Sequence, residues 1–261
     1  MPILERHDTG AVVHLQMNAP DKLNALSDAM LAALQSEFNA LATDKTIRAV
    51  VLSGAGKAFC AGHDLKEMTA GRQAEDGGRA YFKDLFDRCA EMMMTIQRLP
   101  QPVIAQVHGI ATAAGCQMVA SCDMAIAAEG TRFGVNGVNI GLFCSTPMVA
   151  LTRNIPRKQA FEMLTTGQFF AASRAEALGL VNRVVPPEAL ADETAALAAM
   201  VADKLAAAVK IGKQSFYKQL EMPLAEAYAY TGDLMVQNML DRDTAEGISA
   251  FIEKRHPDWT Q

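Results

Sequence analysis

Residues 102–117 read Pro-Val-Ile-Ala-Gln-Val-His-Gly-Ile-Ala-Thr-Ala-Ala-Gly-Cys-Gln, and they give the clearest structural signal in the chain. The first part, 102–107, is an apolar run that is typical of a strand buried on both faces. The second part, 109–116, consists mostly of small residues and leads into an expected helix. A buried strand that passes directly into a helix is typical of an α/β protein.

A second segment has the same layout. Residues 58–66, Ala-Phe-Cys-Ala-Gly-His-Asp-Leu-Lys, follow a β-branched run over 47–52 that ends at Ser53 and Gly54. At such helix starts the first backbone N–H groups have no intrahelical partner and the positive end of the helix dipole is exposed. Two N–H groups directed at one point would hold a developing oxyanion, which contributes roughly 10²–10³ in rate per donor. Small residues also permit close helix–sheet packing, but the repeated layout favours an oxyanion site.

The composition is ordinary for a soluble globular protein and excludes collagen, disorder and a disulfide scaffold. The chain has 261 residues, of which half are hydrophobic and 20% are charged, and 24 Lys and Arg against 29 Asp and Glu give a net charge of −5. This mildly negative charge does not favour binding to nucleic acid, and any anionic ligand must be held by local cations or backbone N–H groups.

One α/β core over 1–187 is expected. The Ala-rich segment 188–261 is predicted to be helical and to serve oligomerisation, although it would equally complete the core.

The cysteine pattern predicts a reducing compartment, and the histidine pattern predicts that the protein has no metal site. The five cysteines are odd in number and form no Cys-x-x-Cys, and no His-x-x-x-His occurs among the five histidines. The N-terminus lacks a signal-peptide pattern, and the apolar stretch 103–128 is broken by polar residues, so we expect a cytoplasmic protein without a membrane span. No Rossmann fingerprint, complete phosphate loop or serine-hydrolase elbow is present.

Periodicity and capping signals predict the other elements. Strands are expected over 12–17 and 123–128, and a Gly-rich loop is expected before residue 79. Helices are expected from a cap at Ser27 to about Ala42, and over 79–98, 157–165, 173–178, 188–208 and 224–240.

The sequence resembles the crotonase (enoyl-CoA hydratase/isomerase) superfamily over essentially its whole length, and most closely the hydratase-domain-containing proteins of mitochondria and their bacterial relatives. The matching segments include Asn18-Ala-Pro-Asp-Lys-Leu-Asn-Ala-Leu26, Lys57-Ala-Phe-Cys-Ala-Gly-His-Asp-Leu-Lys66, Pro102-Val-Ile-Ala-Gln-Val-His-Gly109, Gly115-Cys-Gln-Met-Val-Ala-Ser-Cys-Asp123 and Glu246-Gly-Ile-Ser-Ala-Phe-Ile-Glu-Lys-Arg255. The resemblance implies a spiral of ββα units with a helical C-terminal trimerisation region. It also implies an acyl-CoA thioester as ligand, no covalently bound cofactor or metal, and a homotrimer or dimer of trimers.

Carried over by position, the resemblance implies that the backbone N–H groups of His63 and Ala114 form the oxyanion hole. The CoA moiety is expected to meet the first junction and the segment around residue 22, with cations supplying local positive charge. The residues expected to contact it are Lys22, Leu23, Ala61, Asp64, Leu65, Lys66 and Lys254.

The family's hydratases carry two catalytic glutamates, and here Gln117 and Gly137 stand at those positions. An amide cannot take up a proton at neutral pH and glycine has no side chain, so two-glutamate hydration is disfavoured, whereas a backbone oxyanion hole is retained. The His63 side chain is a candidate base, but it would equally face the CoA or solvent, and Gln117 could hold a water or anion. We expect segment 136–147, which includes Cys144, to line the acyl pocket, and Asp123 and Glu129 to be structural.

Two hypotheses follow. The leading one is an acyl-CoA enzyme of the hydratase/isomerase type, a lyase or isomerase that works through a thioester enolate with nonstandard proton transfer. The alternative is a catalytically silent acyl-CoA binding or regulatory protein that keeps the pocket.

Overall fold

A six-stranded sheet lies at the centre of the computed structural model, which describes residues 1–260. Its order is β1-β2-β3-β4-β6-β9, in which β1 and β2 pair antiparallel and every later pair is parallel. The strands are β1 (Leu4–Thr9), β2 (Val12–Met17), β3 (Ala49–Gly54), β4 (Val103–Val107), β6 (Met124–Ala128) and β9 (Arg183–Val185). The predicted strands at 12–17, 102–107 and 123–128 are confirmed, and the one predicted at 47–52 begins two residues later.

A smaller sheet, which the sequence analysis did not predict, has the order β5-β7-β8. Its strands are β5 (Ile110–Thr112), β7 (Arg132–Gly134) and β8 (Phe170–Ala171). Segments of two or three residues are too short to show an alternating pattern. This sheet matters for the site because β5 connects β4 to the helix that follows the small-residue run.

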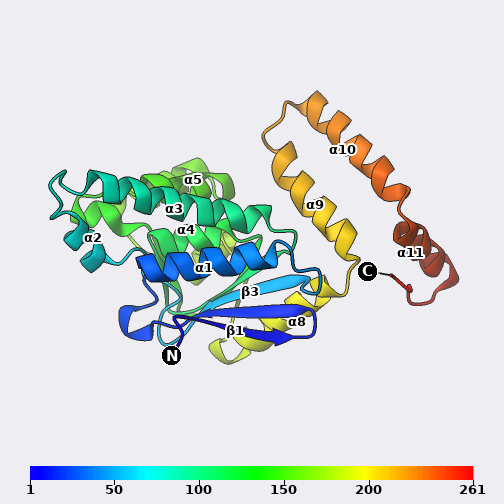
Figure 1. Ribbon diagram of the computed structural model, residues 1–261, viewed down its shortest axis with the longest axis horizontal. Coiled ribbons are helices and arrows are strands. Elements are labelled where there is room, and N and C mark those ends of the chain that lie inside the picture. The colour runs from blue at the N-terminus through cyan, green and yellow to red at the C-terminus, as the bar shows by residue number, and fades with distance from the viewer. Residues whose placement is uncertain (261) are drawn as a thin grey trace.

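Helices cover both faces of the large sheet. On one face lie α1 (Asp28–Leu41), α3 (Arg79–Arg98) and α4 (Ala114–Ser121), and on the other lies α8 (Leu190–Ala202) (Figure 1). Because side chains alternate along a strand, Val50 and Leu52 of β3 join the core under α1, whereas Ala49 and Val51 pack against α8. All six residues of β3 are buried, as expected for a strand covered on both sides.

The helix predictions are largely confirmed. Ser27 caps α1 by accepting from the Met30 N–H, and α3 spans the predicted 79–98. Helices α6 (Arg157–Thr166) and α7 (Ala172–Ala177) also lie where expected. Helix α2 (Leu65–Gly71) begins at the helix start expected in segment 58–66. No prediction was made for α5 (Ser145–Asn154) or for the short helices η1 (Pro20–Lys22), η2 (Asn136–Ile140) and η3 (Pro187–Ala189).

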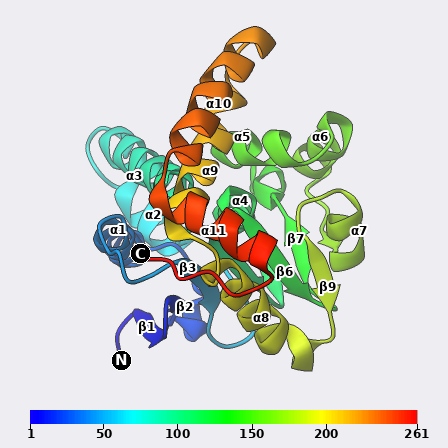
Figure 2. The same cartoon turned by 90° about the vertical axis from the view of Figure 1, so that its right-hand side faces the viewer.

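Every described regular element after β9 is a helix, and three of these helices project from the core. The predicted helix 188–208 is wrong as a single element, because α8 ends at Ala202 and α9 (Ala206–Gln219) begins in a new direction. Asp203 ends α8, and aspartate favours helix ends over interiors. With α10 (Leu224–Met239) and α11 (Arg242–Glu253), α9 forms a segment that we call the C-terminal arm, and it stands away from the sheet (Figures 1 and 2). Within residues 1–260 no helix has the length and apolar character needed to cross a bilayer.

A buried lysine ties the C-terminal arm to the core. Lys213 Nζ on α9 donates to the carbonyl oxygens of Ile96 at 2.7 Å and Gln101 at 2.9 Å, and forms an ion pair with Asp123 Oδ2 at 2.7 Å. The Tyr217 hydroxyl donates to the other oxygen of this carboxylate at 2.8 Å. Burial lowers the pKa of Lys213, and the nearby Asp123 carboxylate opposes that shift. Asp123 is therefore a structural residue, as the sequence analysis expected.

Replacing this lysine should destabilise the protein strongly. Lys213→Met leaves the Asp123 carboxylate buried without its cation, so the free energy of unfolding should fall by about 3–5 kcal/mol. Urea unfolding followed by circular dichroism measures the change. The matched control is Lys210→Met on the exposed side of α9, for which a change within about 0.5 kcal/mol is expected. Equal losses for the two variants would contradict the anchoring role.

Candidate functional site

The two segments singled out in the sequence lie side by side. The N–H of Cys60 donates to the carbonyl of Ile110 at 3.1 Å, and the N–H of Thr112 donates back to the carbonyl of Cys60 at 3.0 Å. The approach becomes closer at the next residues, because a Cβ built on Gly62 would lie 2.9 Å from the Ala113 Cβ and 3.5 Å from the Ala114 nitrogen. The backbone at His63 and the start of α4 are therefore neighbours.

Both predicted oxyanion donors are free. Within residues 1–260, neither the His63 N–H nor the Ala114 N–H donates a hydrogen bond. Ala114 is the first residue of α4, so its N–H is one of the helix's unpaired donors. The carbonyl of Gly62, the residue before His63, accepts from the Leu26 N–H at 2.7 Å, which fixes the plane of the peptide that carries the His63 N–H.

Ala113, which the sequence analysis did not identify, holds the start of α4 in a strained conformation. Its φ of 50° and ψ of −120° lie where residues other than glycine are rarely found. Such strain costs about 1–3 kcal/mol and persists where the surrounding structure enforces it. Here the Ala113 N–H donates to the Gly134 carbonyl at 2.9 Å, and Gly62 packs against the Ala113 side chain. An alanine within a run of alanines carries no sequence signal for this role.

The His63 side chain is neutral and half-buried beside these amides. Its Nδ1 lies 3.4 Å from the Leu26 carbonyl oxygen, which can only accept, so Nδ1 carries the hydrogen and Nε2 presents a lone pair. Its ring packs edge-on against Phe86 with centroids 5.7 Å apart. Burial lowers the pKa of His63, and the Arg88 guanidinium adds to the shift, whereas the Leu26 hydrogen bond opposes it.

Gln117 and Gly137, the positions at which the resemblance implies glutamates in hydratases, are both buried. Gln117 lies one turn into α4 with its N–H donating to Ala113, and no group within residues 1–260 donates to its Oε1 atom. At Gly137 a Cβ would lie 2.2 Å from the Leu142 carbonyl oxygen and 2.8 Å from Cys144 Sγ. Position 137 has no room for any larger residue unless the 137–144 backbone moves.

No other predicted pocket residue supplies an evident base. Burial raises the pKa of the Cys144 thiol, and it raises the pKa of Cys116 to about 12, so both are protonated at neutral pH. The Asn136 and Asn139 amides both donate to the Gly167 carbonyl, at 2.6 and 3.2 Å, and hold the η2 segment to the end of α6. Within residues 1–260 no cluster of three metal-ligating side chains exists.

The residues expected to meet CoA gather at the start of α2, with one exception. Asp64 caps α2 by accepting from the N–H groups of Lys66 and Glu67, and it forms an ion pair with Lys22 at 3.1 Å. Burial alone would raise the pKa of Asp64, but the hydrogen bonds from Lys22 and these N–H groups lower it overall. Leu65 and Lys66 are exposed on α2.

The segment before α1 is held against the first junction by its backbone and by a buried amide. The Ala61 N–H donates to the Leu23 carbonyl at 3.0 Å. Asn24, which lies in the matching segment 18–26, is fully buried and has a φ of 53°. Its amide accepts from the Ala19 N–H and donates to the carbonyl oxygens of Ala55 and Ala58 at 2.9 and 2.8 Å. Segment 18–26 holds other polar residues, so nothing in the sequence marks Asn24 for this role.

Lys254 is the exception. It is the C-cap of α11, which lies at the opposite end of the molecule from α2 along its longest axis (Figure 1). The structure therefore does not bring Lys254 to Lys22 and Lys66 within one chain.

An apolar pocket of about 380 Å³ includes Phe86, whose ring contacts the His63 side chain, and we call it the α2–α3 pocket. Its walls come from α2, α3 and the segment after η2, and consist of Leu65, Met68, Thr69, Arg72, Phe82, Phe86, Ile140, Gly141 and Leu142. Phe86 contacts His63, and the Leu142 carbonyl occupies the space beside Gly137. The pocket thus borders both His63 and the closed position 137.

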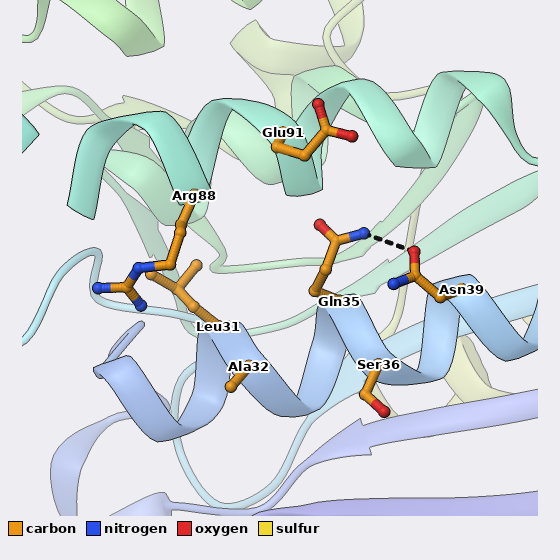
Figure 3. A pocket seen from close by; sticks show the side chains of 7 residues that line it. All are labelled: Leu31, Ala32, Gln35, Ser36, Asn39, Arg88 and Glu91. Atoms are coloured by element: carbon orange, nitrogen blue, oxygen red, sulfur yellow. Dashed lines mark hydrogen bonds between the residues drawn. The ribbon is translucent and has the colours of Figure 1, made fainter. Parts of the chain in front are cut away.

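Two other pockets lie away from these amides. One of about 360 Å³ between α1 and α3 is lined by polar side chains, among them Arg88 and Glu91 (Figure 3). Its charges are already paired, Arg88 with Asp28 and Asp84 and Glu91 with Arg98. The other, of about 450 Å³, lies where α8 and α9 meet the 42–48 loop.

Two free backbone N–H groups beside an apolar pocket are typical of proteins that stabilise an oxyanion formed at an acyl group. The family described as enoyl-CoA hydratase/isomerase matches residues 7–261, and the chain belongs to this family. Human enoyl-CoA hydratase domain-containing protein 3, mitochondrial, is 46% identical over 247 residues, which cover 95% of this chain and 80% of that protein.

Solved structures agree with the fold. A structure titled enoyl-CoA hydratase from Mycobacterium smegmatis aligns with a TM-score of 0.95 and 55% identity over the full length of both chains. The structure of human enoyl-coenzyme A hydratase domain-containing protein 3 aligns with a TM-score of 0.94 and 44% identity, covering 98% of this chain and 100% of that one. The predicted crotonase-type α/β fold with a helical C-terminal region is confirmed.

Closure of position 137 can be tested by adding a single methyl group. Gly137→Ala should lower the free energy of unfolding by about 1–3 kcal/mol, because the new Cβ overlaps the Leu142 carbonyl. The matched control is Gly212→Ala in α9, where nothing lies within 4 Å of the added Cβ. This control should stabilise by about 0.5–1 kcal/mol in urea unfolding. A neutral effect of Gly137→Ala would contradict the closed geometry.

The lowered pKa of His63 makes stability depend on pH. The unfolded chain binds a proton at this side chain near its ordinary pKa of 6.5, above the folded value, so the native state holds fewer protons and loses stability as the pH falls below about 6.5. His63→Gln should make this loss smaller when urea midpoints at pH about 8 and about 5 are compared. The exposed His256→Gln variant should keep the wild-type dependence, and an unchanged slope for His63→Gln would contradict the assignment.

Proposed function

We propose that this protein binds acyl-CoA thioesters and stabilises their enolates, as a lyase or isomerase of the hydratase/isomerase type with nonstandard proton transfer. The observation that carries the proposal is the pair of unpartnered N–H groups at His63 and Ala114 on adjacent backbone. These donors need no side chain, so the enolate oxygen is stabilised whatever residue moves the proton.

Hydration by the two-glutamate route does not fit this chain. Gln117 cannot exchange a proton at neutral pH, and position 137 has no space for a carboxylate. A positioned acid or base contributes about 10²–10⁴ in rate, so addition of water to a 2-enoyl thioester should be slower than in a two-glutamate enzyme by at least that factor.

His63 is the proposed base. With Nδ1–H directed to Leu26, its Nε2 lone pair is free, and burial keeps the ring neutral at physiological pH. In this proposal Nε2 removes a proton from Cα while the His63 and Ala114 N–H groups hold the thioester oxygen. Gln117 Oε1, which has no donor within residues 1–260, would accept from a substrate hydroxyl or a water.

The CoA moiety is proposed to bind at the start of α2, where Lys66 and Lys22 supply positive charge in a chain of net charge −5. Leu23 and Ala61 supply backbone contacts, Asp64 fixes the start of α2, and Leu65 lies exposed beside the pocket. Lys254 is proposed to contribute from another copy of the chain, since α11 is remote from α2.

We also propose a homotrimer or dimer of trimers built through the C-terminal arm. The support is a set of large apolar side chains that the arm exposes: Phe216, Leu220, Leu224, Tyr228, Met235, Val236, Met239, Leu240, Phe251 and Ile252. Exposed apolar patches of this extent mark protein interfaces in soluble proteins.

We propose a cytoplasmic location. The five unpaired, buried cysteines fit a reducing compartment, although the printed name of the human relative includes the word mitochondrial.

The second candidate function is a catalytically silent acyl-CoA binding or regulatory protein. The closed position 137 and the amide at position 117 favour it. The two candidates share the thioester site and differ in whether a Cα proton is transferred.

Proton transfer is tested by incubating saturated acyl-CoAs with the protein in D₂O and reading the product by mass spectrometry. The proposal predicts deuterium uptake at Cα that falls by about 10²–10⁴ in His63→Ala, while affinity for the ester is kept because residue 63 retains its N–H. His256→Ala is the matched control and should exchange at the wild-type rate. Binding without exchange would support the silent protein, and crotonyl-CoA hydration at a two-glutamate rate would refute the argument from Gln117 and Gly137.

A further inference from the structure

One arginine stands out in the α2–α3 pocket. Leu65, Met68 and Arg72 follow one another on one side of α2 and face the aromatic rings of Phe82 and Phe86 on α3. Every other lining side chain is uncharged, so the guanidinium of Arg72 is the pocket's one ionic group within residues 1–260. An apolar cavity with one charged group favours a ligand that is apolar along its length and charged at one end.

Arg72 is exposed at the C-terminal end of α2, contacts the Phe82 ring and has no acidic partner within residues 1–260. Its guanidinium carbon lies 5.3 Å from the centroid of the Phe82 ring. The turn between α2 and α3 fixes this contact, because a Cβ on Gly78 would lie 2.9 Å from the Phe82 ring and 3.0 Å from the Arg72 Cα. No ion pair to Arg72 forms within the described part of the chain, whereas Arg88 and Arg174 pair with carboxylates at 2.6 and 2.7 Å.

The two ends of the α2–α3 pocket differ in the residues that they present. Phe86 contacts His63 at the end where α2 begins, and Arg72 caps the other end of this seven-residue helix. At 1.5 Å per residue the two ends are about 10 Å apart. A chain attached to a carbonyl at the oxyanion donors would enter beside Phe86 and extend toward Arg72.

We propose that the α2–α3 pocket accepts an acyl chain that ends in a carboxylate, and that Arg72 binds this carboxylate and selects for it. The inference rests on the proposed thioester function and names its substrate class as dicarboxylic monothioesters. The planar fork of a guanidinium matches a carboxylate through two parallel hydrogen bonds. The methyl end of an ordinary acyl chain offers no acceptor to these N–H groups. Phe82 and Met68 would enclose the methylene chain.

Binding measured by calorimetry with adipoyl-CoA and hexanoyl-CoA, whose acyl chains have the same length, tests the proposal. The wild type should bind adipoyl-CoA about tenfold more tightly, as expected for one charge-assisted interaction. Arg72→Gln should remove that preference and leave hexanoyl-CoA affinity within about twofold, whereas Arg72→Lys should keep part of it. Arg79→Gln is the matched control, since Arg79 is exposed on α3 and does not line the pocket.

The outcomes separate this inference from the function on which it rests. Equal affinity for the two esters, or a preference that survives Arg72→Gln, would overturn the role of Arg72 and leave thioester binding intact. Absence of binding by either ester would overturn the proposed function and this inference together.

Discussion

Backbone atoms of the 58–63 segment and the start of α4 approach so closely that a Cβ on Gly115 would lie 2.3 Å from the Cys60 carbonyl oxygen. This contact connects the strand–loop units that follow β3 and β4. It requires glycine at residues 62 and 115, and it forces Ala113 into a φ of 50°. The large sheet and its covering helices hold both segments in register. The strained residue, Ala113, lies next to the His63 and Ala114 N–H groups, which have no hydrogen-bond partner within residues 1–260. The oxyanion site is thus a consequence of backbone packing.

The same packing leaves two backbone N–H groups unpartnered within residues 1–260 and closes position 137. Backbone donors survive any substitution that preserves the fold, so the proposed polarisation of a thioester does not depend on Gln117 or Gly137. Position 137 has been closed by the Leu142 carbonyl, which also forms a wall of the α2–α3 pocket. The closed position 137 and one wall of the proposed acyl pocket therefore depend on the same segment. Under the proposed function, the imidazole of His63 and the guanidinium of Arg72 are the groups that would act on an acyl chain.

The sequence predicted the parts of the fold that rest on local patterns. The continuous apolar run of β3 and the cap at Ser27 each identify their element without tertiary information. The small-residue runs predicted two helix starts that pack together, and the resemblance gave His63 and Ala114, whose N–H groups have no partner within residues 1–260; their role as oxyanion donors stays a prediction. Strands of two or three residues were missed because they are too short to show an alternating pattern. The break at Asp203 was missed because it lies within an Ala-rich segment whose composition favours one helix. The strain at Ala113 and the buried contacts of Asn24 were missed because neither residue type signals them. Lys254 was grouped with Lys22 and Lys66 from the resemblance, which does not state which subunit supplies each residue.

The proposed function requires that the His63 and Ala114 N–H groups polarise a thioester carbonyl. Infrared difference spectroscopy with a CoA thioester labelled with ¹³C at the carbonyl measures that polarisation in the bound state without requiring turnover. The structure predicts that the carbonyl stretch shifts to lower frequency on binding than in water, because two preorganised donors in a water-excluded site stabilise negative charge on oxygen. A bound carbonyl that absorbs at or above its frequency in water would contradict the account.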